Sequence, residues 1–269
     1  MQVEKSVIES LVTPTKELMG LSYQTPYKYK IEIDDRWLYC FGISHSHYPQ
    51  DKQFYELKDF LIEFLEKTKR GNNCCLLESN PLPRIESINE DKIISQFGER
   101  GLMVYLCQKH KIEYVFCEET TGQDIRYLTG LSNRQTAELI VICRSLESLI
   151  KKGVDWNLAM EKSHKSLSQE LLASNDELVV SLDEIENKIE KLHKKYKPKA
   201  TLEIFIDWLI SPMSIESPLS SMRRKLSDWR NVNLVQNIIY KLDGNKNVLV
   251  VFGSAHIYLI EPALRFLAK

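Results

Sequence analysis

The chain has 269 residues, the length of one large domain or two small ones. Lysine and arginine total 36 against 37 aspartates and glutamates, and this near-neutral balance argues against general nucleic-acid binding, which usually needs a basic excess. Because no apolar run reaches the roughly 18 residues of a membrane helix, we expect no membrane span. The first residues, MQVEKSVIESLV, lack the basic start and apolar stretch of a signal peptide, so we expect a cytoplasmic protein.

Cysteine usage agrees with a reducing compartment. The six cysteines stand at positions 40, 74, 75, 107, 117 and 143, and no two of them form a CxxC pair. Most lie inside apolar runs, so we expect them to be reduced packing residues, with Cys74 and Cys75 on opposite faces of one strand. Their spacing excludes a zinc ribbon or finger.

The first half of the chain alternates predicted strands and helices. Residues 27–33 alternate polar and apolar side chains, Asp34 and Asp35 supply a turn, and residues 36–42 are more apolar. This pattern predicts a hairpin whose second strand is the more buried. Further along, amphipathic helices and buried strands are predicted in the order helix 51–69, strand 74–77, helix 90–110 and strand 112–117.

The middle of the chain has a different character, because residues 124–243 contain no convincing strand. Gly122 and Gly130 indicate turns. The periodicity predicts successive helices over about 132–153, 155–173, 181–196, 200–210 and 228–242. Ser132 with Gln135, and Ser181 with Glu184, have the spacing of capping boxes that open two of these helices.

Residues 248–252 (VLVVF) then return to a buried strand, and a helix follows it. We therefore expect an α/β fold: a mostly parallel central sheet with crossover helices, an N-terminal hairpin and a large all-helical insertion before the last strand. The expected division assigns 1–123 and 227–269 to the α/β core and 124–226 to the insertion. That insertion could serve as a lid, a partner surface or a homodimer interface.

Polar side chains follow the predicted buried strands at the points where these strands end. His45, Glu78, the pair Glu118 and Glu119, and His256 come after four successive strands. Because ligands bind beyond the carboxyl ends of parallel strands, we expect these side chains to meet at one edge of the sheet. Alternation along the strand turns only one of the two adjacent glutamates toward the site, and we favour Glu118.

Two imidazoles and a carboxylate are the minimum set for a catalytic divalent metal with an open position for water. His45, Glu78 and His256 are therefore candidate ligands for Mn²⁺, Co²⁺, Zn²⁺ or Fe²⁺, whose bound water would become a nucleophile. Without a metal, a histidine–glutamate pair could still activate water. A purely structural alternative is that both histidines cap strand ends and bond to backbone groups.

A glycine precedes each of these histidines by three residues, in Gly42-Ile-Ser-His45 and Gly253-Ser-Ala-His256. We expect these glycines to permit a sharp turn and a close approach to a ligand. One GxxH motif is a weak signal, whereas two that each follow an apolar strand are considerably stronger.

The order of these motifs resembles the TIKI/TraB (PrgY) superfamily, whose wider relatives include erythromycin esterases and ChaN-like proteins. The resemblance rests on the two GxxH motifs, on Leu76-Leu77-Glu78, on Glu118, and on Trp229-Arg230-Asn231 ahead of the last strand. It covers about residues 35–120 and 222–269. In that family an aspartate often follows the arginine, so Asn231 is a departure that argues against a ligand role at this position.

The resemblance implies hydrolysis, which is metal-dependent in TIKI-type proteases and metal-free in the esterases. His45, Glu78, Arg230 and His256 correspond to the family's site, and Glu118 corresponds to its acidic strand end. Arg230 would stabilise an oxyanion or hold a substrate anion.

Three further residues are expected near the strand ends as substrate contacts: Arg84, Arg126 and Tyr48. Both arginines also fit an exposed loop position. Tyr48 would matter most if the pocket held haem, as ChaN-like proteins do.

The leading hypothesis is a hydrolase that directs activated water at an ester, amide or lactone carbonyl in a small-molecule or peptide substrate. The alternatives are a non-catalytic module that binds haem, a nucleotide or a signalling ligand, and a regulatory protein that binds partners through the helical insertion.

Overall fold

The computed structural model describes residues 3–268 apart from 69–71, 79–80, 83–84 and 86–88. Its strands are β1 (Tyr27–Ile33), β2 (Arg36–Ile43), β3 (Asn73–Leu77), β4 (Glu113–Phe116) and β5 (Asn247–Gly253). The helices of the same part of the chain are α1 (Lys5–Leu11), the short 3₁₀ helix η1 (Thr15–Leu18), α2 (Lys52–Thr68), α3 (Glu90–His110), α9 (Ser220–Asp243) and α10 (Ser254–Phe266). The predicted α/β class is confirmed.

The described strands form one sheet in the order β1-β2-β5-β3-β4. β1 and β2 are the antiparallel hairpin, and every other pairing is parallel. The last strand in the sequence, β5, therefore lies at the centre, between β2 and β3. This order places the carboxyl ends of β2, β5 and β3 side by side.

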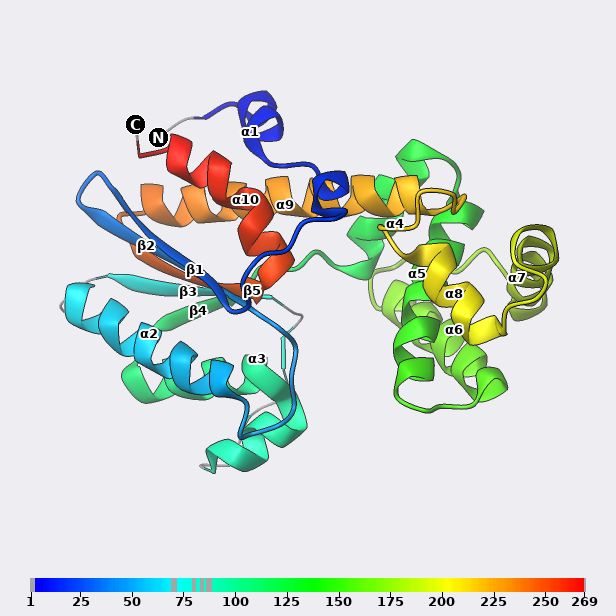
Figure 1. Ribbon diagram of the computed structural model, residues 1–269, viewed down its shortest axis with the longest axis horizontal. Coiled ribbons are helices and arrows are strands. Elements are labelled where there is room, and N and C mark those ends of the chain that lie inside the picture. The colour runs from blue at the N-terminus through cyan, green and yellow to red at the C-terminus, as the bar shows by residue number, and fades with distance from the viewer. Residues whose placement is uncertain (1–2, 69–71, 79–80, 83–84, 86–88, 269) are drawn as a thin grey trace. The chain divides into compact units, whose positions relative to one another are not determined.

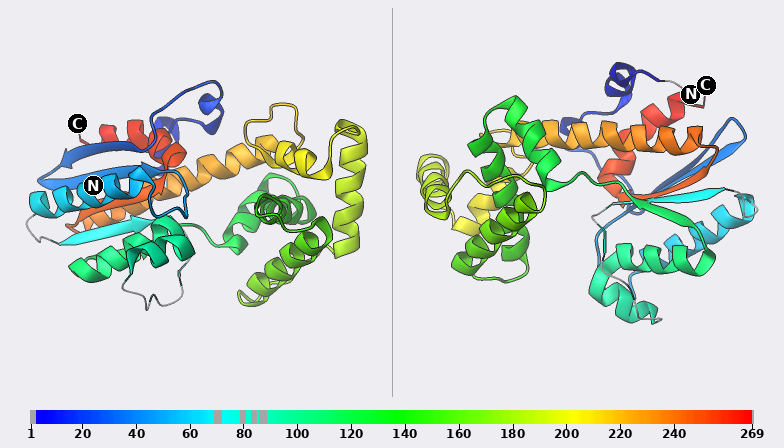
Figure 2. Two further views of the ribbon diagram at one scale, coloured as in Figure 1. Left: turned by 60° about the horizontal axis from the view of Figure 1, so that its bottom comes forward. Right: turned by 180° about the vertical axis from the view of Figure 1, so that it is seen from behind.

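Two layers of helices cover the sheet, as Figure 1 shows and as the rear view in Figure 2 also shows. One hydrophobic core joins α1, α9 and α10 to one face, and a second core joins α2 and α3 to the other. Alternation along β3 sends Cys74 into the first core and Cys75 into the second, as predicted. The edge strand β1 has the alternating burial of a sheet with one solvated face, whereas β2 is the more buried strand of the hairpin, as predicted.

Helix α3 has the predicted bounds but is broken in the middle. Gly98 has φ 64° and ψ −150°, a backbone conformation that is essentially restricted to glycine. The helix therefore consists of two segments, one on each side of Gly98. This break lies beside the loop that follows β2, because a Cβ on Gly98 would stand 2.9 Å from the carbonyl oxygen of Ser46.

The chain separates into two compact units, Met1–Glu118 with Asp228–Lys269, and Glu119–Ser227, against an expected insertion at 124–226. The second unit contains α4 (Thr121–Leu131), α5 (Arg134–Lys151), α6 (Trp156–Leu172), α7 (Leu182–Tyr196), α8 (Leu202–Ile210) and the first residues of α9. Residues 124–243 are all described and contain no strand, as predicted. None of the helices described here combines the length and apolar character required to cross a bilayer.

Three local predictions for this helical unit are corrected. Gly122 and Gly130 are not turns, because both lie inside α4, which a capping box between Thr120 and Gln123 opens. Ser132 does not open α5. Asn133 is the N-cap instead, since its side chain accepts a hydrogen bond from the backbone N–H of Thr136.

Two other local predictions for the helices can be compared with the structure. The capping box of Ser181 and Glu184 is confirmed at the start of α7. Helix α9 begins at Ser220, eight residues before the predicted start at 228.

Gly42, near the end of β2, provides the room that α10 needs to start against the sheet. A Cβ at this position would stand 2.7 Å from the Cα of Ser254 and 3.0 Å from the carbonyl oxygen of Tyr27. Both of these neighbours are backbone atoms, so neither can rotate away. The close approach of strand and helix therefore requires glycine here.

We predict that Gly42→Ala lowers the free energy of unfolding by about 1–3 kcal/mol, the usual range for overpacking a well-packed interior. Gly130→Ala is the matched control, because a Cβ there meets nothing within 4 Å and alanine is the better helix former. Urea denaturation followed by circular dichroism measures both variants. Equal stability of the two would contradict this account of Gly42.

Candidate functional site

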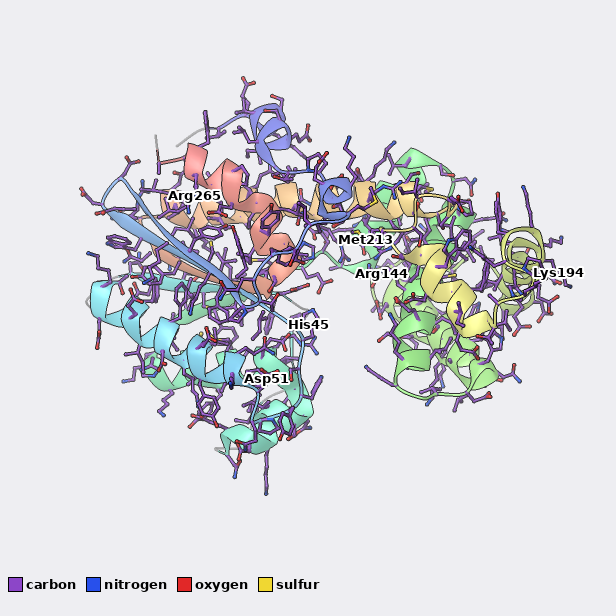
Figure 3. All side chains as sticks on the ribbon, in the orientation of Figure 1. His45, Asp51, Arg144, Lys194, Met213 and Arg265 are labelled. Carbon is purple, nitrogen blue, oxygen red and sulfur yellow. The ribbon has the colours of Figure 1, made fainter. Side chains whose placement is uncertain are left out.

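The sequence places four polar side chains just past the strand ends, and the sheet order brings their positions together. His45 lies two residues beyond β2 (Figure 3), and Glu78 follows β3 directly. Glu118 lies two residues beyond β4. His256 was expected at a strand end. It belongs instead to the first turn of α10, which starts immediately after β5.

Three of these side chains surround Gly253. A Cβ on Gly253 would stand 3.3 Å from Glu78 Oε2, 3.7 Å from His256 Cδ2 and 3.9 Å from His45 Nε2. The backbone N–H of Gly253 also donates a hydrogen bond to Glu78 Oε2, at 2.5 Å. The convergence of both histidines with Glu78 is thus built around the last residue of β5.

The expected sharp turn at the motif glycines does not occur. Gly253 has φ −54° and ψ 139°, an ordinary conformation that any residue could adopt. Gly42 supplies the space for the start of α10. At Gly253 only the contact with Glu78 Oε2 would be tight for a Cβ, whereas both histidines lie at ordinary van der Waals distances. Close approach, and not backbone freedom, explains the presence of Gly42.

His45 bonds to a buried carboxylate on α3. Its Nδ1 donates a hydrogen bond to Oε1 of Glu99 over 2.6 Å. The side chain of Glu99 is only 7% exposed, whereas that of His45 is 62% exposed. The hydrogen bond to Glu99 raises the pKa of His45 to about 9, with a smaller contribution from the charge of Glu78. At neutral pH this ring is therefore an imidazolium whose Nε2–H faces the side of Gly253.

His256 has the opposite electrostatic environment. Its Nδ1 donates to Oδ1 of Asn231 at 2.5 Å, and Asn231 is fully buried. Burial lowers the pKa of His256 and outweighs the opposite effect of the Glu78 charge, while the positive charge of Arg230 acts in the same direction as burial. The ring is therefore neutral at pH 7, and its Nε2 carries the lone pair. This atom lies 3.9 Å from Oε1 of Glu78.

Arg230 forms an ion pair with Glu118, with 3.0 Å between Nη1 and Oε1. Both side chains are mostly buried. Arg230 directly precedes Asn231 on α9, so one turn of this helix supplies both the ion pair and the partner of His256. This ion pair places Glu118, the glutamate favoured from the sequence, beside Arg230.

Glu78 and Glu99 share in the lining of a cavity of about 10 Å³, which is roughly the space that one water molecule needs. It has two carboxylates in its wall and a mainly apolar lining otherwise. The lining residues are Ile43, Leu77, Glu78, Glu99, Arg100, Met103, Val251 and Phe252. The site thus combines charged groups with an apolar floor, and in such surroundings electrostatic interactions are stronger than in water.

The donor types suit a divalent metal, because each histidine bonds an oxygen through Nδ1 and keeps Nε2 for a ligand. The positions of the side chains do not. Among the residues that the structure describes, no three histidine, cysteine, aspartate or glutamate side chains are placed to hold one ion. As placed, His45, Glu78 and His256 do not fit a metal, and their role as metal ligands stays a prediction.

Of the three predicted substrate contacts, the structure describes Tyr48 and Arg126. Tyr48 is exposed on the loop after β2. Arg126 is exposed on α4, in the helical unit, whereas both histidines belong to the other unit. Arg84 lies outside the described residues.

Sequence reasoning missed the two residues that orient the histidines. Glu99 is on a predicted amphipathic helix, where a glutamate normally faces solvent; the neighbouring Gly98 was the available signal, because it weakens a regular helix. Asn231 stands beside a motif residue, but as an amide it does not suggest a metal ligand. Both contacts depend on which elements pack together.

No family model, curated protein or solved structure matches the chain. The resemblance to the TIKI/TraB superfamily therefore rests on the order of the motifs alone.

We predict that the two histidines titrate on opposite sides of the ordinary value of 6.5, His45 near 9 and His256 below 6.5. NMR titration of the ring signals, assigned with His45→Ala and His256→Ala, measures both values. The contribution of protonated His45 to the free energy of unfolding is fully present below pH 6.5 and is lost as the pH rises through about 9. The contribution of neutral His256 to the free energy of unfolding is fully present above pH 6.5 and is lost as the pH falls through the lowered pKa of this ring. The reverse order of titration would refute this description of the site.

Proposed function

We propose that the chain is a hydrolase in which two histidines with opposed protonation states direct water at the carbonyl carbon of an ester, amide or lactone. The observation that carries this proposal is the convergence of His45, Glu78 and His256 around Gly253. A pair of titratable groups whose surroundings separate their pKa values is a typical acid and base pair. The substrate would be a small molecule or a peptide.

His256 is the proposed general base. Asn231 holds the proton on Nδ1, so Nε2 presents its lone pair on the side of Glu78. A water molecule placed against these two groups loses a proton to Nε2 while its oxygen attacks the carbonyl carbon. Glu78 orients this water, and the backbone N–H of Gly253 keeps the Glu78 carboxylate in place.

His45 and Arg230 are the proposed stabilisers of negative charge. As water attacks, the carbonyl oxygen becomes an oxyanion, which the Nε2–H of His45 and the guanidinium of Arg230 can stabilise. When the tetrahedral intermediate collapses, the bond to the leaving group breaks. His45 then transfers its Nε2 proton to the departing alkoxide or amine. Glu118 holds Arg230 through their ion pair.

We expect His256→Ala and His45→Ala each to lower kcat/KM by about 10²- to 10⁴-fold, the usual contribution of acid–base catalysis. The neutral ester 4-nitrophenyl butyrate is a suitable probe. His110→Ala is the matched control, because His110 is exposed at the end of α3 and makes no part of the site. If all three variants hydrolyse the ester like the wild type, the site is not catalytic and a binding role takes its place.

The dependence of the rate on pH should follow the two histidines. Activity needs neutral His256 and protonated His45, so kcat/KM rises as the pH passes the lowered pKa of His256 and falls again near pH 9. Rates over pH 5–10 test this. A profile that keeps rising beyond pH 9 would contradict the assignment of His45 as the acid.

Dependence on a metal is tested in the same assay. Since the described side chains do not fit a metal, we expect hydrolysis to persist after dialysis against EDTA. Loss of activity that Mn²⁺, Co²⁺, Zn²⁺ or Fe²⁺ restores would overturn the metal-independent route. In that case the same ion should raise the melting temperature of the wild type and not that of His256→Ala.

A further inference from the structure

The residues around the break in α3 contact the loop that carries His45. On the N-terminal side of the break, the backbone carbonyl of Ser95 lies 3.3 Å from Nδ1 of His47. On the C-terminal side, Glu99 accepts the hydrogen bond of His45. Between these two contacts, Gly98 lies against the carbonyl of Ser46. The two segments of one helix thus contact three consecutive residues of the loop.

Gly98 allows the two segments of α3 to contact the loop in this way. Its backbone conformation is one that residues with a Cβ rarely adopt, and a Cβ would also stand 2.9 Å from the carbonyl oxygen of Ser46. The chain therefore turns at Gly98, and the second segment starts with Glu99 directed at the loop. A straight helix would carry Glu99 in a different direction, because each residue advances by about 100° around the axis.

We propose that Glu99 is a positioning residue for His45: it fixes the orientation of the ring so that Nε2–H is directed toward Glu78 and Gly253. The proposal deepens the proposed function and rests on it for its catalytic meaning. The hydrogen bond is short, and its acceptor is almost fully buried, whereas the ring that it holds is largely exposed. An exposed ring without such an anchor would sample several rotamers.

Several charged groups act on His45, and its contact with Glu99 has the largest effect on the pKa of the ring. The charged groups that act on the ring are Glu99, Glu78 and Arg100. Glu99 bonds to the ring directly, whereas Glu78 and Arg100 act on it as charges at longer range. The hydrogen bond to Glu99 is the largest of these effects, so loss of the Glu99 carboxylate should change the protonation of His45 more than loss of the Glu78 or Arg100 charge.

The first experiment follows the ring itself and needs no activity. In wild type, NMR spectra of labelled histidine should show His45 with a proton on Nδ1 and titration near pH 9. In Glu99→Gln we expect the pKa of His45 to move toward 6.5. Asp91→Asn removes one exposed charge from the same helix and is the matched control, with an unchanged titration. Identical titration in Glu99→Gln and wild type would overturn the proposal.

The second experiment asks whether the positioning matters for the reaction. With 4-nitrophenyl butyrate, we expect Glu99→Ala to lower kcat about tenfold to a hundredfold with little change in KM, and Glu99→Gln to recover part of that loss. In a His45→Ala background, Glu99→Gln should cause no further loss, because the ring that it positions is gone. A further loss of equal size would show a merely structural role and overturn the proposal.

These two experiments separate failure of this inference from failure of the proposed function. If no variant of the histidines alters hydrolysis, the proposed function fails, while the titration of His45 still decides whether Glu99 holds the ring. If the histidine variants lose activity and Glu99→Gln leaves both the titration and kcat unchanged, only the role of Glu99 is wrong.

Discussion

The parallel alignment of β2, β5 and β3 is the constraint on which the rest of the structure depends. Parallel strands in neighbouring positions end at the same edge, so residues that are far apart in the chain follow one another across that edge. Because β5 is central, His256 is brought between His45 and Glu78. Gly42 completes the arrangement, because α10 starts against the sheet at a distance that a Cβ would prevent.

The second organising feature is the difference between the two histidines. Both use Nδ1 to bind an oxygen and leave Nε2 on the side of Glu78 and Gly253, but their partners differ in charge. A carboxylate holds the proton on His45, whereas burial, with a smaller effect of the Arg230 charge, favours the neutral form of His256. Two chemically identical rings can therefore serve as acid and base in the proposed site, because the surroundings of the two rings shift their pKa values in opposite directions.

The sequence predicted where the site residues stand relative to the strands, but it did not predict which residues contact them in the folded protein. Hydrophobic periodicity located the strands that end beside His45 and Glu78, because burial on both faces leaves continuous apolar runs. It could not show the break at Gly98, since an amphipathic pattern continues on both sides of the break. The prediction of the N-cap of α5 was wrong for a similar local reason. Ser132 and Asn133 are both good N-cap residues, and only the backbone geometry distinguishes them.

The sequence by itself determined the α/β class, the succession of strands and helices, and the residues that stand at the strand ends, because these depend on local patterns of two to four residues. The tertiary structure alone decided that β5 lies between β2 and β3, and that Glu99 and Asn231 become the partners of the histidines. The physical reason is that hydrogen-bond partners are chosen by packing between distant elements. The protonation of His45 follows from its bond to Glu99, and that of His256 follows mainly from its burial, so the chemistry proposed for both rings depends on packing.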